Sequence, residues 1–539
     1  MPRVSRSEFL GFLAAGGIAA LAGMGKISSP RAVNNFDNQA AAQVSGSWKA
    51  GPSALNHPVH LALLPSGKVL YVAGSGFHRP SASGPFKAGI WNPTTNAQKE
   101  YLLDKDIWCS GHALLPNGNV LFVGGTLKYA KDSLNRLWWG LNSTYEFNFQ
   151  TETFLNRPAM KHGRWYPTVV CLANGKIQVV DGYDEFGYNN LLTEIYDPAN
   201  KTWTISYAPN SSDTYCVGCG PEGCANVEGA GEKCYGGTNR GVAPLVDPYP
   251  RMHLLPNGMV ACVGQDPIRY LWEPSTGSWY EAGTGVERSF GTSVLLPLQN
   301  TTTEKGKILI CGGSDDPSFP AIAKKSAEIL EQSDLKLVSK FAPSMTFPRR
   351  YCNPVILPDG KVLIIGGTQE NNDKSLAVYK PEMFDPITKK WAILSPHSVP
   401  RIYHSGALLL TDGRVYVAGS SYSPYSYELR TEIFSPAYMF EQRPKISGIS
   451  ATTTYGKEFE ITTLNASAIK TVSMVRFSST THHYNTDQRL LWLQIISKTG
   501  NIIKVSSPRN SRLAPPGYYM VHILNWSGIP SKAATMQVL

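Results

Sequence analysis

The sequence predicts an all-β protein in which a seven-bladed β-propeller is followed by a smaller β-sandwich. Three observations support this fold class. Glycine and proline account for 49 and 38 of the 539 residues, while charged residues make up only 17%. A short phrase recurs seven times along most of the chain, and the C-terminal part carries a different alternating pattern. Turn residues with few charges suit β-strands, whereas helical bundles need charged solvent faces.

The recurring phrase reads Leu-Pro-x-Gly, then a short apolar stretch, then one glycine or two. Copies such as LLPNGNVLFVGGT and ILPDGKVLIIGGT follow one another about every 50 residues, with one longer step between Gly175 and Gly258. Each copy predicts two strands joined by a tight turn, because Asn-Gly and Asp-Gly favour turns that need a positive φ. The copies lie at 63–75, 114–126, 171–183, 254–266, 305–314, 356–368 and 409–420.

A repeat of this length with a double glycine at the strand end is typical of kelch repeats, each of which forms one propeller blade. Seven such blades close into a ring. We therefore predict a seven-bladed kelch-type β-propeller over residues 45–435. The alternative, an open β-solenoid, has much shorter repeats.

The C-terminal residues 440–539 do not continue the repeat. Alternating segments such as KTVSMVRFSS and GYYMVHILNW are separated by proline and glycine turns. About 100 residues of this pattern predict an immunoglobulin-like β-sandwich. This domain is either a separate module or one that packs on the propeller and lends it a residue.

The N-terminal residues 1–29 predict a signal peptide and therefore a secreted protein. Arg3 and Arg6 precede a short stretch rich in glycine and alanine. A membrane anchor is the alternative, but spanning a bilayer takes about 20 strongly apolar residues. Six Asn-x-Ser/Thr sequons, which permit but do not establish a glycoprotein, lie at Asn142, Asn200, Asn210, Asn300, Asn465 and Asn525.

The longer step in the repeat contains a cysteine-rich insertion at 208–240. Four cysteines so close together form either a zinc site or two disulfide bonds. Disulfides are favoured in an exported chain, with the pairing left open. The four are Cys216, Cys219, Cys224 and Cys234. Three other cysteines fall within predicted strands and are expected to be buried apolar side chains: Cys171, Cys262 and Cys311.

The composition also excludes some partners. The formal net charge is +10, but no run of five or six like charges occurs, so nucleic acid is a poor candidate. No stretch beyond the N-terminus is long and apolar enough to span a membrane, so no stable membrane association is expected. The sequence shows no convincing dinucleotide-binding βαβ fingerprint.

Candidate chemical residues interrupt the apolar pattern at four places. Cys109 in DIWCSGHALL, Tyr166 in GRWYPTVVCL and the pair Tyr403–His404 in RIYHSGALLL each precede the first apolar strand of a blade. In a propeller that position faces the central axis, so these residues should converge. His482 in TTHHYNTDQR lies in the C-terminal domain. Two imidazoles and two phenols together suit a transition metal, copper above all.

These residues resemble a known family, the copper radical oxidases, which include galactose oxidase and glyoxal oxidase. The resemblance covers nearly the whole chain after residue 29. Its most specific parts are R-x-Y-H-S at 401–405, T-H-x-x-N-T-D-Q-R at 481–489, and P-G-Y-Y-M with N-W-S-G-I-P-S at 516–520 and 525–531. W-C-S-G at 108–111 and R-W-Y-P at 164–167 support it through their positions in the blades.

The resemblance implies one copper ion and a self-made organic cofactor. Tyr166 would be an equatorial ligand, His404 and His482 the imidazole ligands, and Tyr403 the axial phenol. Cys109 would be joined to the ring of Tyr166 by a thioether bond, forming a Cys-Tyr radical cofactor. Adjacent residues on a strand face opposite sides, so only one of His482 and His483 could bind, and the family register selects His482.

The resemblance also implies the reaction. A tyrosyl radical on Tyr166 and the copper would each accept one electron from the substrate, and Tyr403 would accept its hydroxyl proton. O2 would then be reduced to hydrogen peroxide. R-W-Y-P and the absence of a preceding carbohydrate-binding domain resemble the glyoxal oxidase branch. A small aldehyde of the glyoxal or methylglyoxal type, oxidised as its hydrate to a carboxylic acid, is the first expectation.

One departure and two alternatives accompany this expectation. Galactose oxidase stacks a Trp over the cross-linked Tyr, but the matching segment here, Asp181-Gly182-Tyr183-Asp184, has none. Another aromatic side chain covers the radical, or the radical is more exposed. A primary alcohol or galactose oxidase of the same mechanism is the second reading. A non-catalytic secreted kelch scaffold is the third, although it would not need Cys109, Tyr166, Tyr403, His404 and His482 together.

Overall fold

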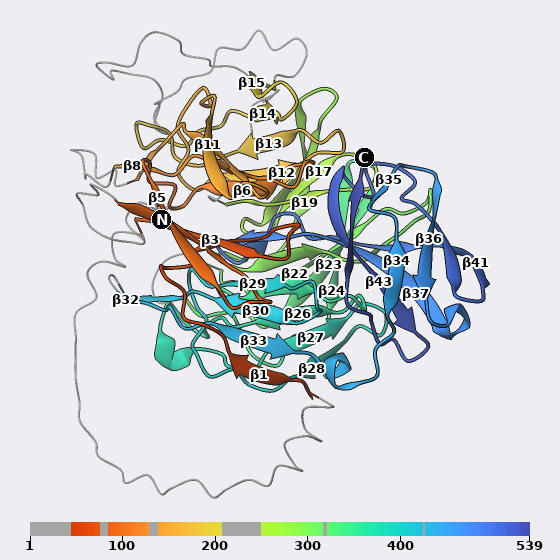
Figure 1. Cartoon of the computed structure of the whole chain (residues 1–539). Coiled ribbons are helices and arrows are strands. Elements are labelled where there is room, and N and C mark those ends of the chain that lie inside the picture. Colours follow the sequence, from red (N-terminus) through yellow and green to blue (C-terminus); the bar gives the residue numbers. More distant parts are fainter. Residues whose placement is uncertain (1–44, 76–84, 129–137, 207–248, 316–320, 424–425) are drawn as a thin grey trace, which may run out of the picture.

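The computed structural model describes residues 45–75, 85–128, 138–206, 249–315, 321–423 and 426–539. It is an all-β structure in which seven sheets form a ring beside a C-terminal β-sandwich (Figure 1). The predicted signal peptide at 1–29 and the cysteine-rich insertion at 208–240 lie outside the described residues.

The seven sheets each contain four strands in meander order, and the first gains two more strands from the C-terminal domain. The first four sheets comprise β2 (His60–Leu63), β3 (Val69–Gly74), β4 (Phe86–Trp91) and β5 (Gln98–Leu103); β6 (Gly111–Leu114), β7 (Val120–Val123), β10 (Thr144–Asn148) and β11 (Thr153–Arg157); β12 (Thr168–Cys171), β13 (Ile177–Val180), β14 (Glu194–Asp197) and β15 (Thr202–Ile205); and β16 (Arg251–Leu254), β17 (Val260–Val263), β18 (Ile268–Glu273) and β19 (Ser278–Thr284).

The last three sheets follow the same plan, with one outer strand taken from the start of the chain. They comprise β20 (Thr292–Leu295), β22 (Lys307–Cys311), β23 (Ala327–Ser333) and β24 (Lys336–Ala342); β25 (Asn353–Ile356), β26 (Val362–Ile365), β27 (Glu382–Asp385) and β28 (Lys390–Ile393); and β29 (Gly406–Leu409), β30 (Val415–Ala418), β33 (Glu432–Ser435) and β1 (Ser47–Ala50). Two short hairpins project from blades: β8 (Thr126–Lys128) with β9 (Trp139–Gly140), and β31 (Ser421–Ser423) with β32 (Ser426–Tyr427).

The two ends of the repeat region meet. Strand β1 pairs with β33, so the N-terminal strand completes the last sheet. The inner strand β29 of that sheet also contacts β2, the inner strand of the first. The predicted seven-bladed propeller is therefore confirmed as the fold, and strand β1 supplies the outer strand of its last blade.

The recurring Leu-Pro-x-Gly phrase forms the tight turns that it predicts. In the first blade the amide of Gly67 donates to the carbonyl of Leu64 at 2.8 Å, and the amide of Leu64 donates to Lys68. Gly67 has a φ of 79°, which a side chain would strain. The strands on either side are fully buried, so their apolar runs form the propeller core.

The double glycines bring neighbouring blades together. A Cβ on Gly366 would lie 2.3 Å from the carbonyl oxygen of Arg401, so only glycine fits. The next residue, Gly367, donates its amide to that same oxygen at 2.7 Å. The arginine side chain turns back into its own blade and pairs with a buried glutamate. The same arrangement recurs in four blades, in the pairs Arg164–Glu194, Arg288–Glu328, Arg349–Glu382 and Arg401–Glu432.

Removal of Glu382 is expected to destabilise the fold strongly. Arg349 and Glu382 are completely buried and lie 2.9 Å apart, and Glu382 also accepts the amides of Thr346 and Phe347. Glu382→Ala leaves the guanidinium charge buried without its carboxylate, which costs about 3–5 kcal/mol. Urea unfolding measures this loss. Glu331→Ala, in the half-exposed pair with Lys307, should cost about 1 kcal/mol or less, and an equal loss in both variants would contradict the argument.

The C-terminal domain consists of two facing sheets with a shared apolar core, as the sequence predicts for a β-sandwich (Figure 1). One strand from the propeller, β21, joins it. The strands are β21 (Leu298–Gln299), β34 (Ile446–Ile449), β35 (Thr452–Thr453), β36 (Glu458–Thr463), β37 (Ile469–Arg476), β40 (Leu490–Leu493), β41 (Ile495–Thr499), β42 (Ile502–Ser506), β43 (Gly517–Asn525) and β44 (Ala534–Val538).

A hairpin leaves this domain and enters the propeller. Strands β38 (Ser479–Thr481) and β39 (Tyr484–Asn485) pair with each other, and β38 also pairs with β2 of the first blade. The hairpin contacts inner strands of other blades as well, including β6, β20, β25 and β29. The sandwich is thus the alternative in which the domain packs on the propeller and contributes residues to its centre.

In the part of the chain that the structure describes, the helical elements are short. They are the 3-10 turns η1 (Lys374–Leu376), η2 (Ala437–Phe440) and η3 (Ala466–Ala468). Among the described residues, no helix has the length and apolar character needed to cross a membrane. Cys171, Cys262 and Cys311 are buried at or near the ends of strands, as predicted for apolar core positions.

Candidate metal centre

The candidate site is built from one backbone position that recurs around the propeller. In six blades a non-glycine residue with a φ between 57° and 69° lies two positions before the inner strand. Residues other than glycine rarely adopt this left-handed backbone conformation, and such backbone strain is concentrated at functional sites. In the first blade the position is Pro58, whose ring fixes a negative φ. The six residues are Cys109, Tyr166, Tyr249, Phe290, Tyr351 and His404.

Backbone hydrogen bonds link these positions from blade to blade. The amide of Tyr166 donates to the carbonyl of Cys109 at 2.9 Å, and the amide of Tyr249 donates to that of Tyr166 at 3.1 Å. Tyr351 donates to Phe290 at 2.9 Å in the same way. The left-handed turn therefore satisfies a buried amide while it changes the direction of the side chain.

The hairpin from the C-terminal domain delivers His482 to the same place. Its Nε2 lies 3.8 Å from Sγ of Cys109, and its ring centroid lies 4.7 Å from that of Tyr166. The sequence places His482 and His483 on a strand, and this is wrong, because both occupy the turn between β38 and β39. Both have a positive φ. They still diverge, since the His483 ring packs 5.3 Å from Tyr351.

All five residues expected at the site come together. The ligand atoms of Cys109, His404 and His482 lie within 4.8 Å of one another. The hydroxyl groups of Tyr166 and Tyr403 share a hydrogen bond. All five side chains are buried.

The two histidines are oriented alike. Nδ1 of His404 lies 2.9 Å from Oγ of Ser421, and Nδ1 of His482 lies 2.6 Å from Oγ1 of Thr481. A metal-binding imidazole usually bonds to a protein group through one ring nitrogen, which makes the other nitrogen, here Nε2, the candidate ligand atom. Two imidazoles with two phenols form a donor set that copper accepts. The residues present therefore fit the expected metal.

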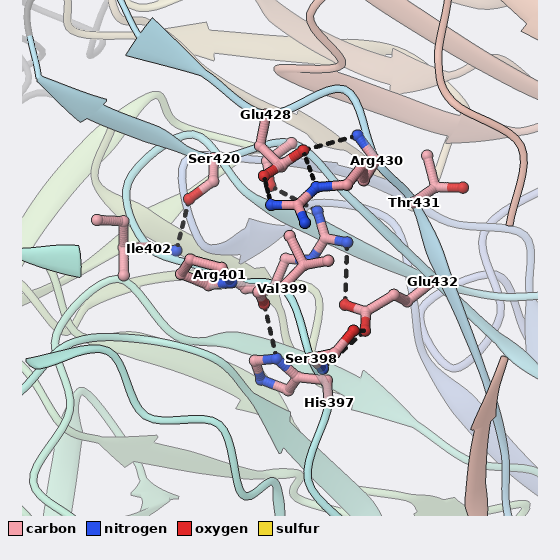
Figure 2. A network of polar contacts seen from close by, with 12 residues as sticks. His397, Ser398, Val399, Arg401, Ile402, Ser420, Glu428, Arg430, Thr431 and Glu432 are labelled. Carbon is pink, nitrogen blue, oxygen red and sulfur yellow. Dashed lines mark hydrogen bonds and ion pairs between the residues drawn. The ribbon is translucent and has the colours of Figure 1, made fainter. Parts of the chain in front are cut away.

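The segment with Tyr403 and His404 is anchored by the blade's buried ion pair (Figure 2). Arg401 donates to Oε2 of Glu432 at 3.0 Å and to the carbonyl of Gly419 at 3.0 Å. The next amide, that of Ile402, donates to Oγ of Ser420 at 2.9 Å. The ion pair between Arg401 and Glu432 therefore stabilises the blade and also positions Tyr403 and His404, which follow Arg401 in the chain.

Burial keeps the protein groups uncharged. It lowers the pKa of His404 and of His482 well below the usual value, and the neighbouring imidazoles lower both further. It also raises the pKa of the Tyr166 phenol and of the Cys109 thiol. Neutral imidazoles are ready to bind a metal. A bound cation would favour the phenolate form of Tyr166, which reverses the effect of burial.

An aromatic stack covers Tyr166. The ring of Trp165 lies 3.7 Å from the ring of Tyr166 at an interplanar angle of 29°. Trp138 stacks on the far face of Trp165 at 4.5 Å, and Tyr183 lies 5.8 Å from Trp165. Of the two possibilities left open by the missing Trp near Tyr183, the structure shows the first, since another aromatic side chain covers the ring.

Tyr249 is the site residue that sequence reasoning missed. Its ring stacks on His482 at 4.3 Å and lies 4.5 Å from Tyr166, and its hydroxyl donates to the carbonyl of Ser110 at 2.8 Å. The available signal was its place two residues before the inner strand of the fourth blade, which matches the places of Cys109 and Tyr166.

Comparison with known proteins identifies relatives over most of the chain. The family description "Glyoxal oxidase N-terminus" matches residues 248–438, and "Galactose oxidase-like, Early set domain" matches residues 443–538. Together they span the second part of the propeller and the sandwich.

Individual relatives agree with these families. The chain is 26% identical over 511 residues to "Galactose oxidase" of Gibberella zeae, covering 89% of this chain and 69% of that protein. It is 27% identical over 488 residues to "Aldehyde oxidase GLOX" of Vitis pseudoreticulata, covering 84% and 85%. A solved fungal alcohol oxidase of the AA5 family in complex with copper shares the fold, with a TM-score of 0.74 at 24% identity over 92% of this chain and 99% of that one.

Proposed function

Since the chain belongs to the copper radical oxidase family, and is therefore an oxidase, we propose that it oxidises small aldehydes to carboxylic acids and reduces O2 to hydrogen peroxide. Glyoxal and methylglyoxal, reacting as hydrates, are the proposed substrate type. The observation that best supports this proposal is the convergence of side chains from three blades on His482 of the C-terminal hairpin: Cys109, Tyr166, Tyr403 and His404. A scaffold has no need for this convergence.

We propose that Tyr166, Tyr403, His404 and His482 hold one copper ion, and that Cys109 is joined to Tyr166 by a thioether. A copper ion held there would supply one-electron redox chemistry for one of the two electrons that leave the substrate. An oxidised Tyr166 ring would take the other, so the residues would support a two-electron oxidation. The sulfur adds electron density to the ring, which eases oxidation of Tyr166, and the stacked Trp165 excludes water from one face.

Tyr403 is proposed as the base. Its hydroxyl is hydrogen-bonded to that of Tyr166, so it lies where a substrate hydroxyl must approach the radical-bearing ring. A base within hydrogen-bond reach of the reacting proton contributes about 10²–10⁴-fold. The aldehyde hydrate would give up one hydroxyl proton to Tyr403 and one C–H hydrogen to Tyr166.

The aldehyde reading is favoured over a sugar alcohol by the surroundings of Tyr403. Its ring lies 5.1 Å from Tyr351 and 6.3 Å from Phe290, and these three rings pack together, with the guanidinium of Arg350 over two of them. A sugar offers several hydroxyls that need polar partners when buried. A small aldehyde hydrate needs few. The match to an aldehyde oxidase covers 85% of that relative, against 69% of the galactose oxidase, which agrees with this choice.

A substrate panel tests the function. The protein is loaded with copper, its metal content is measured, and peroxide release is followed with glyoxal, methylglyoxal, galactose and a simple primary alcohol. We expect one copper per chain and the fastest turnover with the two aldehydes. Faster turnover of galactose or the simple alcohol would establish the alternative reading. Absence of copper and of peroxide release would establish a non-catalytic scaffold.

From residues 1–29 we further propose that the enzyme is secreted, with small-molecule substrate and O2 as its partners.

A further inference from the structure

The short segment Cys109–Ser110 is held from two sides by side chains that are not among the proposed copper ligands. On one side, the backbone amide of Cys109 donates to Nε2 of His60 at 3.1 Å. On the other, the hydroxyl of Tyr249 donates to the carbonyl of Ser110 at 2.8 Å. Cys109 itself has a φ of 58°, so these hydrogen bonds stabilise a backbone conformation that is unfavourable for a residue other than glycine.

His60 comes from the strand that receives the C-terminal hairpin. It is the first residue of β2, and the next two residues of β2 pair with β38, the strand that leads into His482. The His60 ring is 1% exposed and lies 5.9 Å from the ring of His482. Since Nε2 accepts a hydrogen bond, a neutral ring carries its proton on Nδ1. One residue thereby connects the cysteine segment to the strand beside the hairpin.

Tyr249 comes from the opposite direction, at the start of the fourth blade. It contacts two site residues: its ring stacks on that of His482 and lies against that of Tyr166, and its amide donates to the carbonyl of Tyr166 at 3.1 Å. It is 3% exposed. Its hydroxyl is the part of the side chain that reaches past these rings to Ser110.

We propose that His60 and Tyr249 are positioning residues that hold the Cys109 thiol against the ring of Tyr166 while the thioether bond forms. This inference rests on the proposed function. In the step, a bond forms between Sγ and a ring carbon beside the phenol oxygen, and the S–H and C–H bonds break. The two electrons and two protons pass to O2, giving one hydrogen peroxide. The amide and carbonyl bonds fix both ends of the residue that supplies the sulfur.

Positioning of this kind should have a measurable effect on the rate of cross-linking. A displacement of about 1 Å between reacting atoms lowers a rate by about 10²-fold. Without its hydroxyl partner the carbonyl of Ser110 is left buried, and the segment gains freedom to shift. The cross-link should then form slowly, although the ligand set for copper is unchanged.

The test follows cross-linking over time in the full-length protein. Copper-free protein receives copper and O2, samples are digested, and mass spectrometry measures the fraction of joined Cys109 and Tyr166 peptides. Tyr249→Phe deletes one oxygen, and His60→Leu deletes the acceptor. Each substitution should slow cross-linking at least tenfold, and each variant should still bind one copper ion per chain. His60→Gln keeps a side-chain acceptor and should return much of the rate, which a merely structural role would not predict.

Tyr351→Phe is the matched control. Tyr351 occupies the equivalent position of the sixth blade with a φ of 62°, but its ring packs against Phe290, Tyr403 and His483. It should cross-link at the wild-type rate. Wild-type rates in both Tyr249→Phe and His60→Leu would overturn the inference. If His60→Leu does not fold, the Tyr249→Phe result decides alone. If the wild-type protein itself forms no link, the proposed function fails instead.

Discussion

Tyr403→Phe is expected to lower turnover by at least 100-fold although the other three proposed copper ligands remain, so that copper still binds at the loading concentration and the Cys109–Tyr166 link still forms. The substitution keeps the ring, which packs 3.9 Å from His404 and 5.1 Å from Tyr351, and removes only the phenol oxygen. That oxygen is the proposed acceptor of the substrate proton. Loss of a positioned base costs about 10²–10⁴-fold in rate. Steady-state peroxide release with methylglyoxal measures the effect, with copper content and the cross-linked fraction determined on the same sample.

Tyr416→Phe serves as the control for this substitution. Tyr416 is also buried and aromatic and lies in the same blade, but its ring stacks on Trp91 in the propeller core. Its loss should leave kcat close to the wild-type value. Near wild-type turnover of Tyr403→Phe would show that another group accepts the proton.

His482→Ala is expected to weaken copper binding by at least about 100-fold. Substitution of residues that merely orient a ligand typically costs about 10–100-fold in metal affinity, so loss of a direct nitrogen ligand should cost no less. Competition with a copper chelator of known affinity gives the dissociation constants. The proposal also requires that the fold survive, which thermal unfolding of the copper-free variant checks.

The neighbouring His483→Ala is a sharp control for the same experiment. Both residues occupy the hairpin turn, but only His482 approaches Cys109, whereas His483 packs on Tyr351. His483→Ala should retain copper within a few-fold of the wild type. Equal losses in the two variants would mean that the turn as a whole, rather than the His482 ring, is needed for binding.

Much of this arrangement was predictable because it repeats. The turn glycines and double glycines gave the number of blades, since each must adopt a backbone that other residues avoid. The blade positions of Cys109, Tyr166 and His404 then followed from their places before an inner strand. The same rule would have found Tyr249, but that residue follows the insertion at 208–240 and belongs to no motif that the family resemblance supplied.

The rest depends on conformations that alternation along a strand does not describe. Trp165 and Tyr166 are adjacent, and in a regular strand their rings would point to opposite faces. The φ of 69° at Tyr166 redirects its side chain, and the two rings stack instead. His482 and His483 likewise occupy a turn, so their divergence comes from two left-handed residues and not from a strand.

The central claim, that Cys109 and Tyr166 form one radical cofactor, is tested most directly by peptide mass spectrometry of the copper-loaded enzyme. The account predicts that the peptides with Cys109 and Tyr166 are recovered joined, with a mass two hydrogens below the sum of the separate peptides. It also predicts that Cys109→Ser, which binds copper, never gives the joined species. Separate, unmodified peptides from a sample that releases peroxide would contradict the account.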